Sequence, residues 1–109
     1  MSNLENSDQE GISRAQVIEA LGIIIDPELG INIVDMGLIY FAEIDEQGKN
    51  ILIEMTLSSR GCPMGAAIIG GSENILKSYF PAYRIDVQLV WEPAWLPDFI
   101  SEEGRQILE

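Results

Sequence analysis

The sequence contains no histidine and a single cysteine, Cys62. Without histidine, one chain cannot form a Ser-His-Asp or Cys-His catalytic arrangement, and it cannot form a histidine-based zinc site. A lone cysteine excludes an internal disulfide and an all-cysteine metal site within one chain, and it agrees with a reducing compartment. A metal bound through Cys62 therefore needs its other ligands from carboxylates, a second subunit or a small thiol.

Cations and long apolar runs are also scarce. The chain has 6 lysines and arginines against 18 acidic residues, which gives a formal net charge of −12. Dispersed cations cannot follow a phosphate backbone, so we expect neither nucleic acid nor an anionic membrane as a partner. The longest apolar or small-residue run, 64–71, is far shorter than the roughly 20 residues of a membrane-spanning helix. Met1–Glu10 lacks the basic and apolar regions of a secretory signal, so we expect a cytoplasmic protein.

The length of 109 residues suits one domain. Residues 1–11 are polar, acidic and without periodicity, and we interpret them as a disordered tail. Residues 12–109 then form a single domain. Its first element is predicted to be a helix over about 13–24, because Ser13 and Gln16 fit a capping box.

The remaining periodicities predict an α+β fold in the order α-β-β-α-β-α. Alternating apolar side chains predict strands over 38–44, 50–58 and 84–91, the first two joined as a hairpin. A second helix is predicted over 63–79, with its proline at the first helical position. The third strand returns after that helix, so we expect a small three-stranded mixed sheet covered by helices. The buried face of the second helix is expected to carry Ile68, Ile69, Ile75, Leu76 and Tyr79.

Cys62 is the first candidate for chemistry because it is predicted to start the second helix. Unsatisfied backbone N–H groups and the positive end of the helix dipole favour a thiolate, which is the form that binds metals and attacks electrophiles. Arg60 lies two residues earlier and adds positive potential. A free cysteine is also among the most buried residue types, so a space-filling role stays open.

Three other features are candidates, each with a structural alternative. Asp26 and Glu28 flank a rigid proline and are placed to converge on a cation, although Asp-Pro is also a common turn signal. Thr56 is placed to bring a hydroxyl near the thiol, or it is an ordinary strand residue. Trp91 and Trp95 enclose a proline-containing loop that forms a groove for a partner or packs onto the sheet.

Five short segments follow one another along the chain: Asp26–Gly30, Val34–Tyr40, Met55–Leu57 with Gly61–Met64, Trp91–Trp95 and Ser101–Arg105. Together they resemble the SufT/PaaD-like family of metal–sulfur cluster assembly factors, over about residues 13–108. Eukaryotic relatives in that family belong to the cytosolic iron–sulfur targeting complex. PaaD members proper carry an extra cysteine-rich C-terminal segment. This sequence has no such segment up to Glu109, so the resemblance predicts the stand-alone SufT-like role.

The resemblance implies a role in maturing iron–sulfur proteins, as a carrier or targeting adaptor and not as an enzyme. It implies that Cys62 is the metal-related or cluster-related residue and that Asp26, Glu28 and Thr56 line the same cofactor-binding site. The expected cargo is a transient iron–sulfur cluster or iron, with no tightly bound cofactor. The implied partners are the iron–sulfur assembly machinery and client apoproteins, and a homodimer is expected because dimers are common in the family.

The thiol count sets a condition on the carrier role, because iron–sulfur clusters are typically held by four cysteine thiolates. A dimer would bring two Cys62 side chains to one cluster, with external thiols completing it; otherwise Cys62 acts only in handover or client contact. Two further functions stay open. One is a thiol enzyme with Cys62 as nucleophile and Asp26 or Glu28 as base. The other is an interaction module that uses the Trp91–Trp95 loop while Cys62 is buried.

Overall fold

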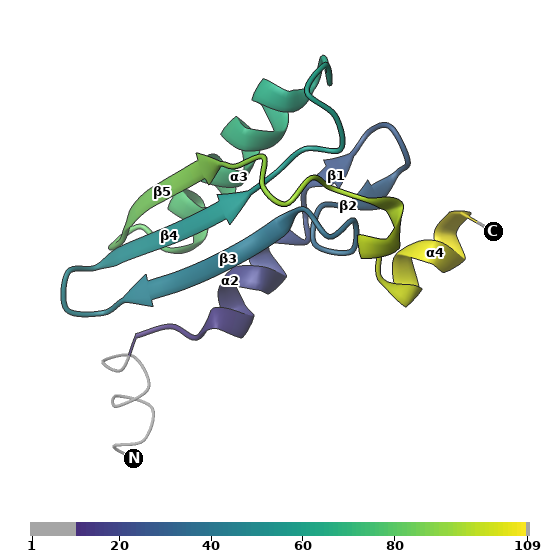
Figure 1. The fold of residues 1–109 in the computed structure, drawn as a ribbon. Helices are drawn as coiled ribbons and strands as arrows, with labels where there is room; N and C mark the ends of the chain where they lie inside the picture. Colours follow the sequence, from purple (N-terminus) through teal and green to yellow (C-terminus); the bar gives the residue numbers. More distant parts are fainter. Residues whose placement is uncertain (1–10, 109) are drawn as a thin grey trace.

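The computed structural model describes residues 11–108, which form the expected succession of helices and strands with a small hairpin and a short 3-10 helix added (Figure 1). In chain order the elements are α2 (Arg14–Leu21), β1 (Ile25–Asp26), β2 (Ile31–Asn32), β3 (Ile39–Asp45), β4 (Asn50–Met55), α3 (Gly65–Tyr79), β5 (Arg84–Leu89), the 3-10 helix η1 (Pro97–Phe99) and α4 (Glu102–Leu108). Most of the tail expected over 1–11 lies outside the described residues, as does Glu109. The division into a tail and a domain over 12–109 stays a prediction.

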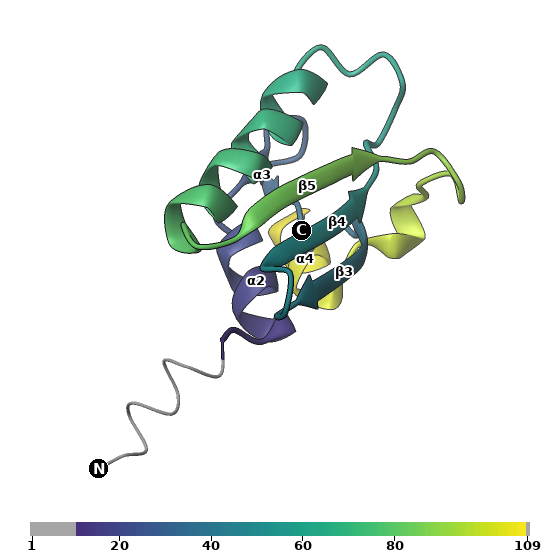
Figure 2. The same cartoon turned by 90° about the vertical axis from the view of Figure 1, so that its left-hand side faces the viewer.

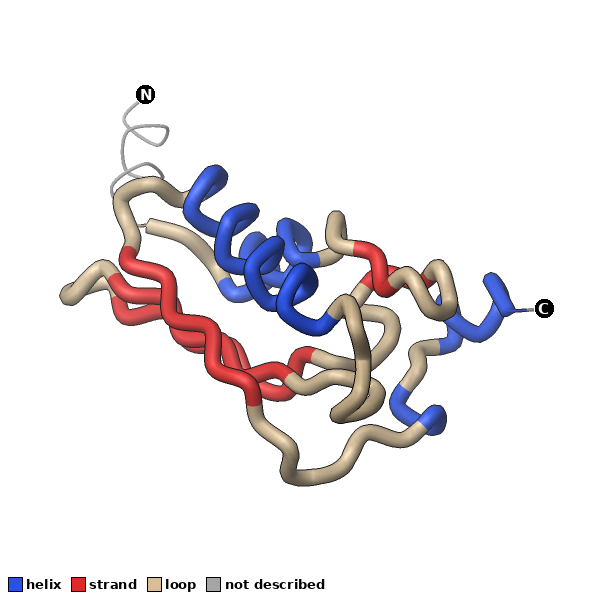
Figure 3. The backbone as a smooth tube through the Cα atoms, turned by 90° about the horizontal axis from the view of Figure 1, so that it is seen from above, coloured by secondary structure: helices blue, strands red, loops and turns tan. Residues whose placement is uncertain are grey.

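Strands β3, β4 and β5 form one mixed sheet, in that spatial order. β3 and β4 are an antiparallel hairpin, and β5 runs parallel to β4 after the chain has passed through α3. Helices α2 and α3 lie on one face of the sheet (Figure 3), and α3 runs alongside β5 (Figure 2). The predicted α+β fold with a three-stranded mixed sheet is therefore confirmed.

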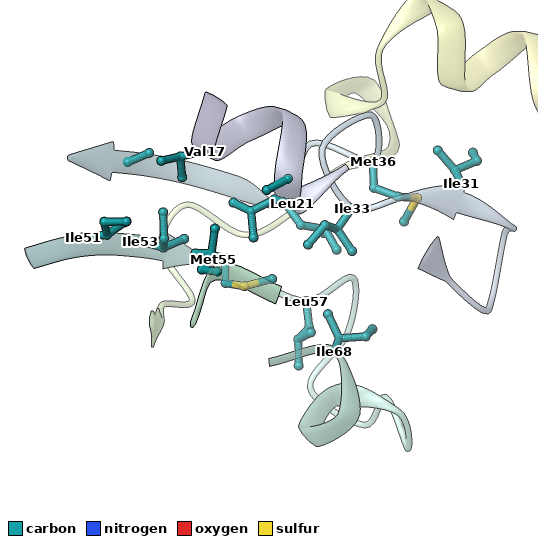
Figure 4. Packing of buried hydrophobic residues seen from close by; sticks show 14 of the residues in the cluster. Val17, Leu21, Ile31, Ile33, Met36, Ile51, Ile53, Met55, Leu57 and Ile68 are labelled. Carbon is teal, nitrogen blue, oxygen red and sulfur yellow. The ribbon is translucent and has the colours of Figure 1, made fainter. Parts of the chain in front are cut away.

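The core lies between the sheet and the helices (Figure 4). On β4, Ile51, Ile53 and Met55 are fully buried while Leu52 and Glu54 are only partly buried, which confirms the predicted alternation. Burying a large apolar side chain stabilises a fold by about 1.5–3 kcal/mol relative to leaving it exposed. The helices contribute Val17 and Leu21 from α2 and Ile68 and Leu76 from α3.

A separate two-stranded sheet, formed by β1 and β2, was not expected from the sequence. Ile25 pairs with Asn32 and Asp26 pairs with Ile31, in antiparallel register. Strands of two residues are too short to show a period, so only the finished fold reveals them. The hairpin buries Asp26 and Ile31 at its base and leaves residues 27–30 of the turn exposed.

The predicted capping box at the start of α2 is present. The Ser13 hydroxyl oxygen accepts from the Gln16 backbone N–H at 3.2 Å, and the Gln16 side-chain oxygen accepts from the Ser13 N–H at 2.7 Å. The helix ends at Leu21, with Gly22 as C-cap, rather than at residue 24. Glycine is a poor helix former, and the residues that follow it turn into the β1–β2 hairpin.

Helix α3 begins at Gly65, so the prediction that Pro63 is its first residue is wrong. The Gly65 N–H donates to the Cys62 carbonyl at 3.1 Å, which makes a tight turn ahead of the helix. At the other end, Tyr79 is 53% exposed instead of buried. Phe80, the next residue, is buried in its place because the chain leaves the helix there.

Candidate functional site

Cys62 lies in the loop between β4 and α3 and is half-buried. Its N–H donates to the Ser59 carbonyl at 3.3 Å. Because Met64 is the N-cap of α3, the Cys62 carbonyl, and not its thiol, receives an N–H of the first turn. The residue lines a cleft of about 540 Å³ between α3 and β5. Cys62 therefore packs partly against the core and partly lines this cleft.

Arg60 and Trp91 line the same cleft as Cys62. The Arg60 guanidinium carbon lies 4.4 Å from the Trp91 ring centroid, which is the geometry of a cation–π contact. β5 ends at Leu89, so Trp91 belongs to the following loop and not to the strand predicted over 84–91. Arg60 forms no salt bridge with any residue of 11–108. The cation expected near Cys62 therefore lines the same cleft, which also contains the carboxylate of Glu73, although the two form no salt bridge.

Asp26 is fully buried, which is unusual for a carboxylate. Its Oδ1 atom accepts from the Glu28 backbone N–H at 2.9 Å, the hydrogen bond of an Asx turn. Its Oδ2 atom is buried and has no hydrogen-bond partner within the described part of the chain. The turn predicted at Asp26-Pro27-Glu28 is therefore present, but the second carboxylate oxygen of Asp26 remains without a hydrogen-bond partner among residues 11–108.

Thr56 also has a buried oxygen without a hydrogen-bond partner among the described residues. It follows β4 and is fully buried, with its N–H donating to the Leu38 carbonyl at 2.9 Å. The Thr56 hydroxyl has no partner among residues 11–108. Burying a hydroxyl without a hydrogen bond costs about 1–3 kcal/mol in protein mutational data, so such groups need an explanation. A polar ligand or a polar group of a partner would provide one.

Glu28 is exposed, and its Oε1 atom accepts from the Ser58 hydroxyl at 2.8 Å. This hydrogen bond joins the turn after β1 to the loop after β4 that also carries Cys62. Asp26 and Thr56 each lie two residues before one end of the Glu28–Ser58 bond. The structure therefore brings the turn and the loop of Cys62 together, which the family resemblance implied.

A row of adjoining clefts connects Glu28 with Cys62. Glu28, Ser58 and Ser59 line one of about 460 Å³, and the two serines also line a second of about 320 Å³. Arg60 belongs both to that second cleft and to the one that holds Cys62. The two serines were not singled out in the sequence, because a Ser-Ser pair after a strand is an ordinary loop composition.

Trp95 anchors the loop that follows β5 and borders these clefts. Its indole N–H donates to the Met36 carbonyl at 2.7 Å, and both tryptophans are half-buried. The loop therefore packs onto the domain through Trp95 while Trp91 faces Arg60. Both tryptophans pack against the core, as the packing alternative predicts, and Trp91 also lines the cleft of Cys62. That the loop forms a groove for a partner stays a prediction.

Within residues 11–108, no group of three or more cysteine, aspartate or glutamate side chains is arranged to hold a metal ion. The candidates Asp26, Glu28, Thr56 and Cys62 thus do not make a self-sufficient metal centre in one chain. None of the helices in the described part of the chain is long and apolar enough to cross a membrane.

Comparison with known proteins identifies the family of this chain. The family model described as "Iron-sulfur cluster assembly protein" matches residues 14–86. The Fe-S protein maturation auxiliary factor SufT of Staphylococcus aureus is 42% identical over 83 residues, which are 76% of this chain and 93% of that protein. The Fe-S protein maturation auxiliary factor YitW of Bacillus subtilis is 36% identical over 92 residues, 84% of this chain and 89% of that protein.

Solved structures extend the agreement to the fold. A domain of unknown function from Bacillus anthracis superposes with a TM-score of 0.81 at 35% identity, covering 86% of this chain and 89% of that one. The family match includes the Asp26 turn, Thr56 and Cys62 and stops before Trp91. The resemblance expected from the five segments is confirmed, and the chain belongs to the iron–sulfur cluster assembly protein family.

Proposed function

We propose that this protein is an auxiliary factor in the maturation of iron–sulfur proteins and that it acts through Cys62. The observation that carries the proposal is the cleft in which the only cysteine lies beside the unpaired Arg60 and the Trp91 ring. The names of its relatives support the same role, since SufT and YitW are both called maturation auxiliary factors. An auxiliary role is that of a carrier or adaptor and not of an enzyme.

The cargo of this role is an iron–sulfur cluster or iron, bound transiently. Iron–sulfur clusters are typically held by four thiolates, and one chain provides a single cysteine. Cys62 would therefore supply one ligand, and a second subunit, the client or small thiols would supply the others. A half-buried thiol at an open cleft suits a ligand that is exchanged. The positive charge of Arg60 favours an anionic, thiolate-bound cargo.

Asp26, Glu28 and Thr56 belong to the same proposed site. Glu28 holds the loop that carries Cys62 through its hydrogen bond with Ser58. Asp26 and Thr56 each have a buried oxygen without a partner among residues 11–108, and a client that parts the two loops would supply the missing hydrogen-bond donor. Each such hydrogen bond to a charged group contributes about 1.5–3 kcal/mol.

The proposed partners are the iron–sulfur assembly machinery and the client apoproteins that receive the cargo, with a homodimer as the proposed state in the cytoplasm. A second chain would add a second Cys62 to one cluster, which is the reason that a dimer suits the carrier form. The adaptor form needs only that Cys62 contacts the client.

Complementation tests the proposal. A bacterial strain deleted for its own relative of this protein is supplied with the wild-type chain, Cys62→Ala or Cys62→Ser, and the activity of iron–sulfur dehydratases is measured under iron limitation. Wild type should restore activity, while both variants should fail although they fold normally. If Cys62→Ala restores activity as well as wild type does, Cys62 is not the working group and the proposal is wrong.

A further inference from the structure

The sheet has a second face that the helices do not cover (Figure 3). Directly paired residues share one face of a sheet, and neighbours along a strand alternate between faces. Ala42, Ile53 and Val87 pair across the three strands and face the core. The other face, here called the open face, carries Phe41, Glu43 and Asp45 of β3, Asn50, Leu52 and Glu54 of β4, and Arg84, Asp86 and Gln88 of β5.

The open face combines an exposed aromatic ring with unpaired negative charge. Phe41 is 41% exposed and pairs with Glu54. Leu52 lies between Glu43 and Asp86 in one row across the sheet. None of these three carboxylates forms a salt bridge within residues 11–108. Glu43 and Asp86 both pair with Leu52, and Glu54 pairs with Phe41 and Gln88, so the three carboxylates surround apolar side chains and none of them opposes a cation. A positively charged partner would neutralise this charge.

A groove runs along the end of this face. Tyr40, Phe41 and Glu54 form one side of a cleft of about 680 Å³, and Pro93 and Phe99 form the other. The Tyr40 hydroxyl donates to the Pro93 carbonyl at 2.8 Å, and the Tyr40 and Phe99 rings meet edge to face with centroids 6.1 Å apart. These contacts hold the loop after β5 against β3, so the groove is built from fixed parts.

The groove leads towards the cysteine. Glu92 lines it and also lines the cleft that contains Arg60 and Trp91. Those two residues in turn line the cleft of Cys62. A chain that lies across the open face and along the groove therefore reaches the candidate site without leaving the surface of the protein.

We propose that the open face docks a basic segment of a partner protein, in which lysine or arginine side chains flank an apolar residue. The apolar residue fits the groove beside Phe41, and the cations pair with Glu43, Glu54 and Asp86. Charge complementarity selects this occupant, because a second copy of a chain with net charge −12 would bring like charge to the same face. The inference rests on the proposed function, since the partner would be a client or an assembly protein.

A peptide titration tests the docking directly. An isotope-labelled chain is titrated with a synthetic peptide in which lysine alternates with phenylalanine and valine, and with its glutamate counterpart, while amide signals are followed by NMR. The lysine peptide should shift signals of β3, β4, β5 and the Glu92–Pro93 segment, and added salt should weaken binding. The proposal is overturned by an unshifted open face, by equal shifts at all carboxylates, or by equal binding of the glutamate peptide.

A charge reversal supplies the matched variant. Glu43→Lys/Glu54→Lys should weaken the lysine peptide about tenfold, because each exposed ion pair is replaced by a repulsion. Its Tm should stay the same or rise, since the reversal removes like-charge repulsion on the face. Glu19→Lys/Glu103→Lys changes the net charge equally on exposed residues elsewhere and should bind like wild type. Equal weakening by both variants would mean that only net charge matters, and would overturn the proposal.

The complementation assay separates this inference from the proposed function. Docking predicts that Glu43→Lys/Glu54→Lys loses client activity at least about fivefold while the Glu19/Glu103 control keeps it. If Cys62→Ala fails and the open-face variant succeeds, docking on this face is wrong and the proposed function stands. If Cys62→Ala succeeds, the proposed function is wrong, and the peptide titration still decides whether the face binds a basic segment.

Discussion

Replacing Thr56 by valine should make the protein more stable and less active. The side chain is fully buried, and its hydroxyl has no hydrogen-bond partner among the described residues. Valine has nearly the same shape and removes the unpaired oxygen, while the backbone hydrogen bond to Leu38 is kept. Since an unpaired buried hydroxyl costs about 1–3 kcal/mol, we expect Thr56→Val to raise the free energy of unfolding by about 1–2 kcal/mol.

Thermal unfolding measures this effect. For a domain of 109 residues, 1 kcal/mol corresponds to a change in Tm of about 4–5 °C, so Thr56→Val should melt about 4–10 °C higher. Thr56→Ser is the control, because it keeps the hydroxyl and loses one buried methyl, which costs about 0.8 kcal/mol and lowers Tm. A lower Tm for Thr56→Val would show that the hydroxyl is paired in solution and would refute the reasoning.

The functional half of this prediction uses the same variants. If the hydroxyl is kept for a polar group of the cargo or client, Thr56→Val should reduce maturation activity in the complementation assay, while Thr56→Ser should keep most of it. Sites that sacrifice stability for function show this opposition of sign. A variant that is both more stable and fully active would assign Thr56 to the fold alone.

Two further predictions concern stability. A Cβ at Gly104 would lie 2.8 Å from Ile100 Cγ2 and 3.2 Å from Ile31 Cγ2, so Gly104→Ala should lower Tm, because overpacking costs about 1–3 kcal/mol. A Cβ at Gly70 would meet nothing within 4 Å, so Gly70→Ala should raise Tm because alanine is the better helix former. If calorimetry shows a higher Tm for both variants, the close packing around Gly104 is contradicted. The Tyr83 hydroxyl and the Ile12 N–H lower the pKa of Glu46 from 4.5. A carboxylate whose pKa is lower in the folded state than in the unfolded state stabilises the fold at pH values above its unfolded pKa. This stabilisation is lost as the pH falls through the folded pKa. Glu46→Gln should therefore flatten the dependence of Tm on pH below about 4.5, and an unchanged slope would contradict this.

Local patterns in the sequence predicted the parts of the fold that depend on nearby residues. The β4 alternation and the Ser13–Gln16 capping box need only short-range spacing, and both are present. The start of α3 could not be predicted from spacing alone. Proline is favoured at a first helical position, but here Pro63 lies in the turn from Cys62 to Gly65, before the N-cap residue Met64.

The site was partly predictable because its residues gather around two loops. The family resemblance implied that Asp26 and Cys62 belong to one site. The contact that joins their two loops is the Glu28–Ser58 hydrogen bond, which links residues 30 positions apart and could not be predicted from local patterns. The burial of Asp26 was not predictable, because a carboxylate in a turn is usually solvated. The anchoring of Trp95 on Met36, across 59 residues, likewise exists only in the folded chain.

Anaerobic reconstitution with iron and sulfide tests the role of Cys62 most directly. Wild type, Cys62→Ala and Cys62→Ser are compared for thiolate-to-iron absorption, bound iron and acid-labile sulfide, and then for transfer to an apoprotein. We predict that wild type gains a labile cluster that passes to the apoprotein and that both variants gain none. An equal cluster in Cys62→Ala, or none in folded wild type, would contradict a cargo held through Cys62.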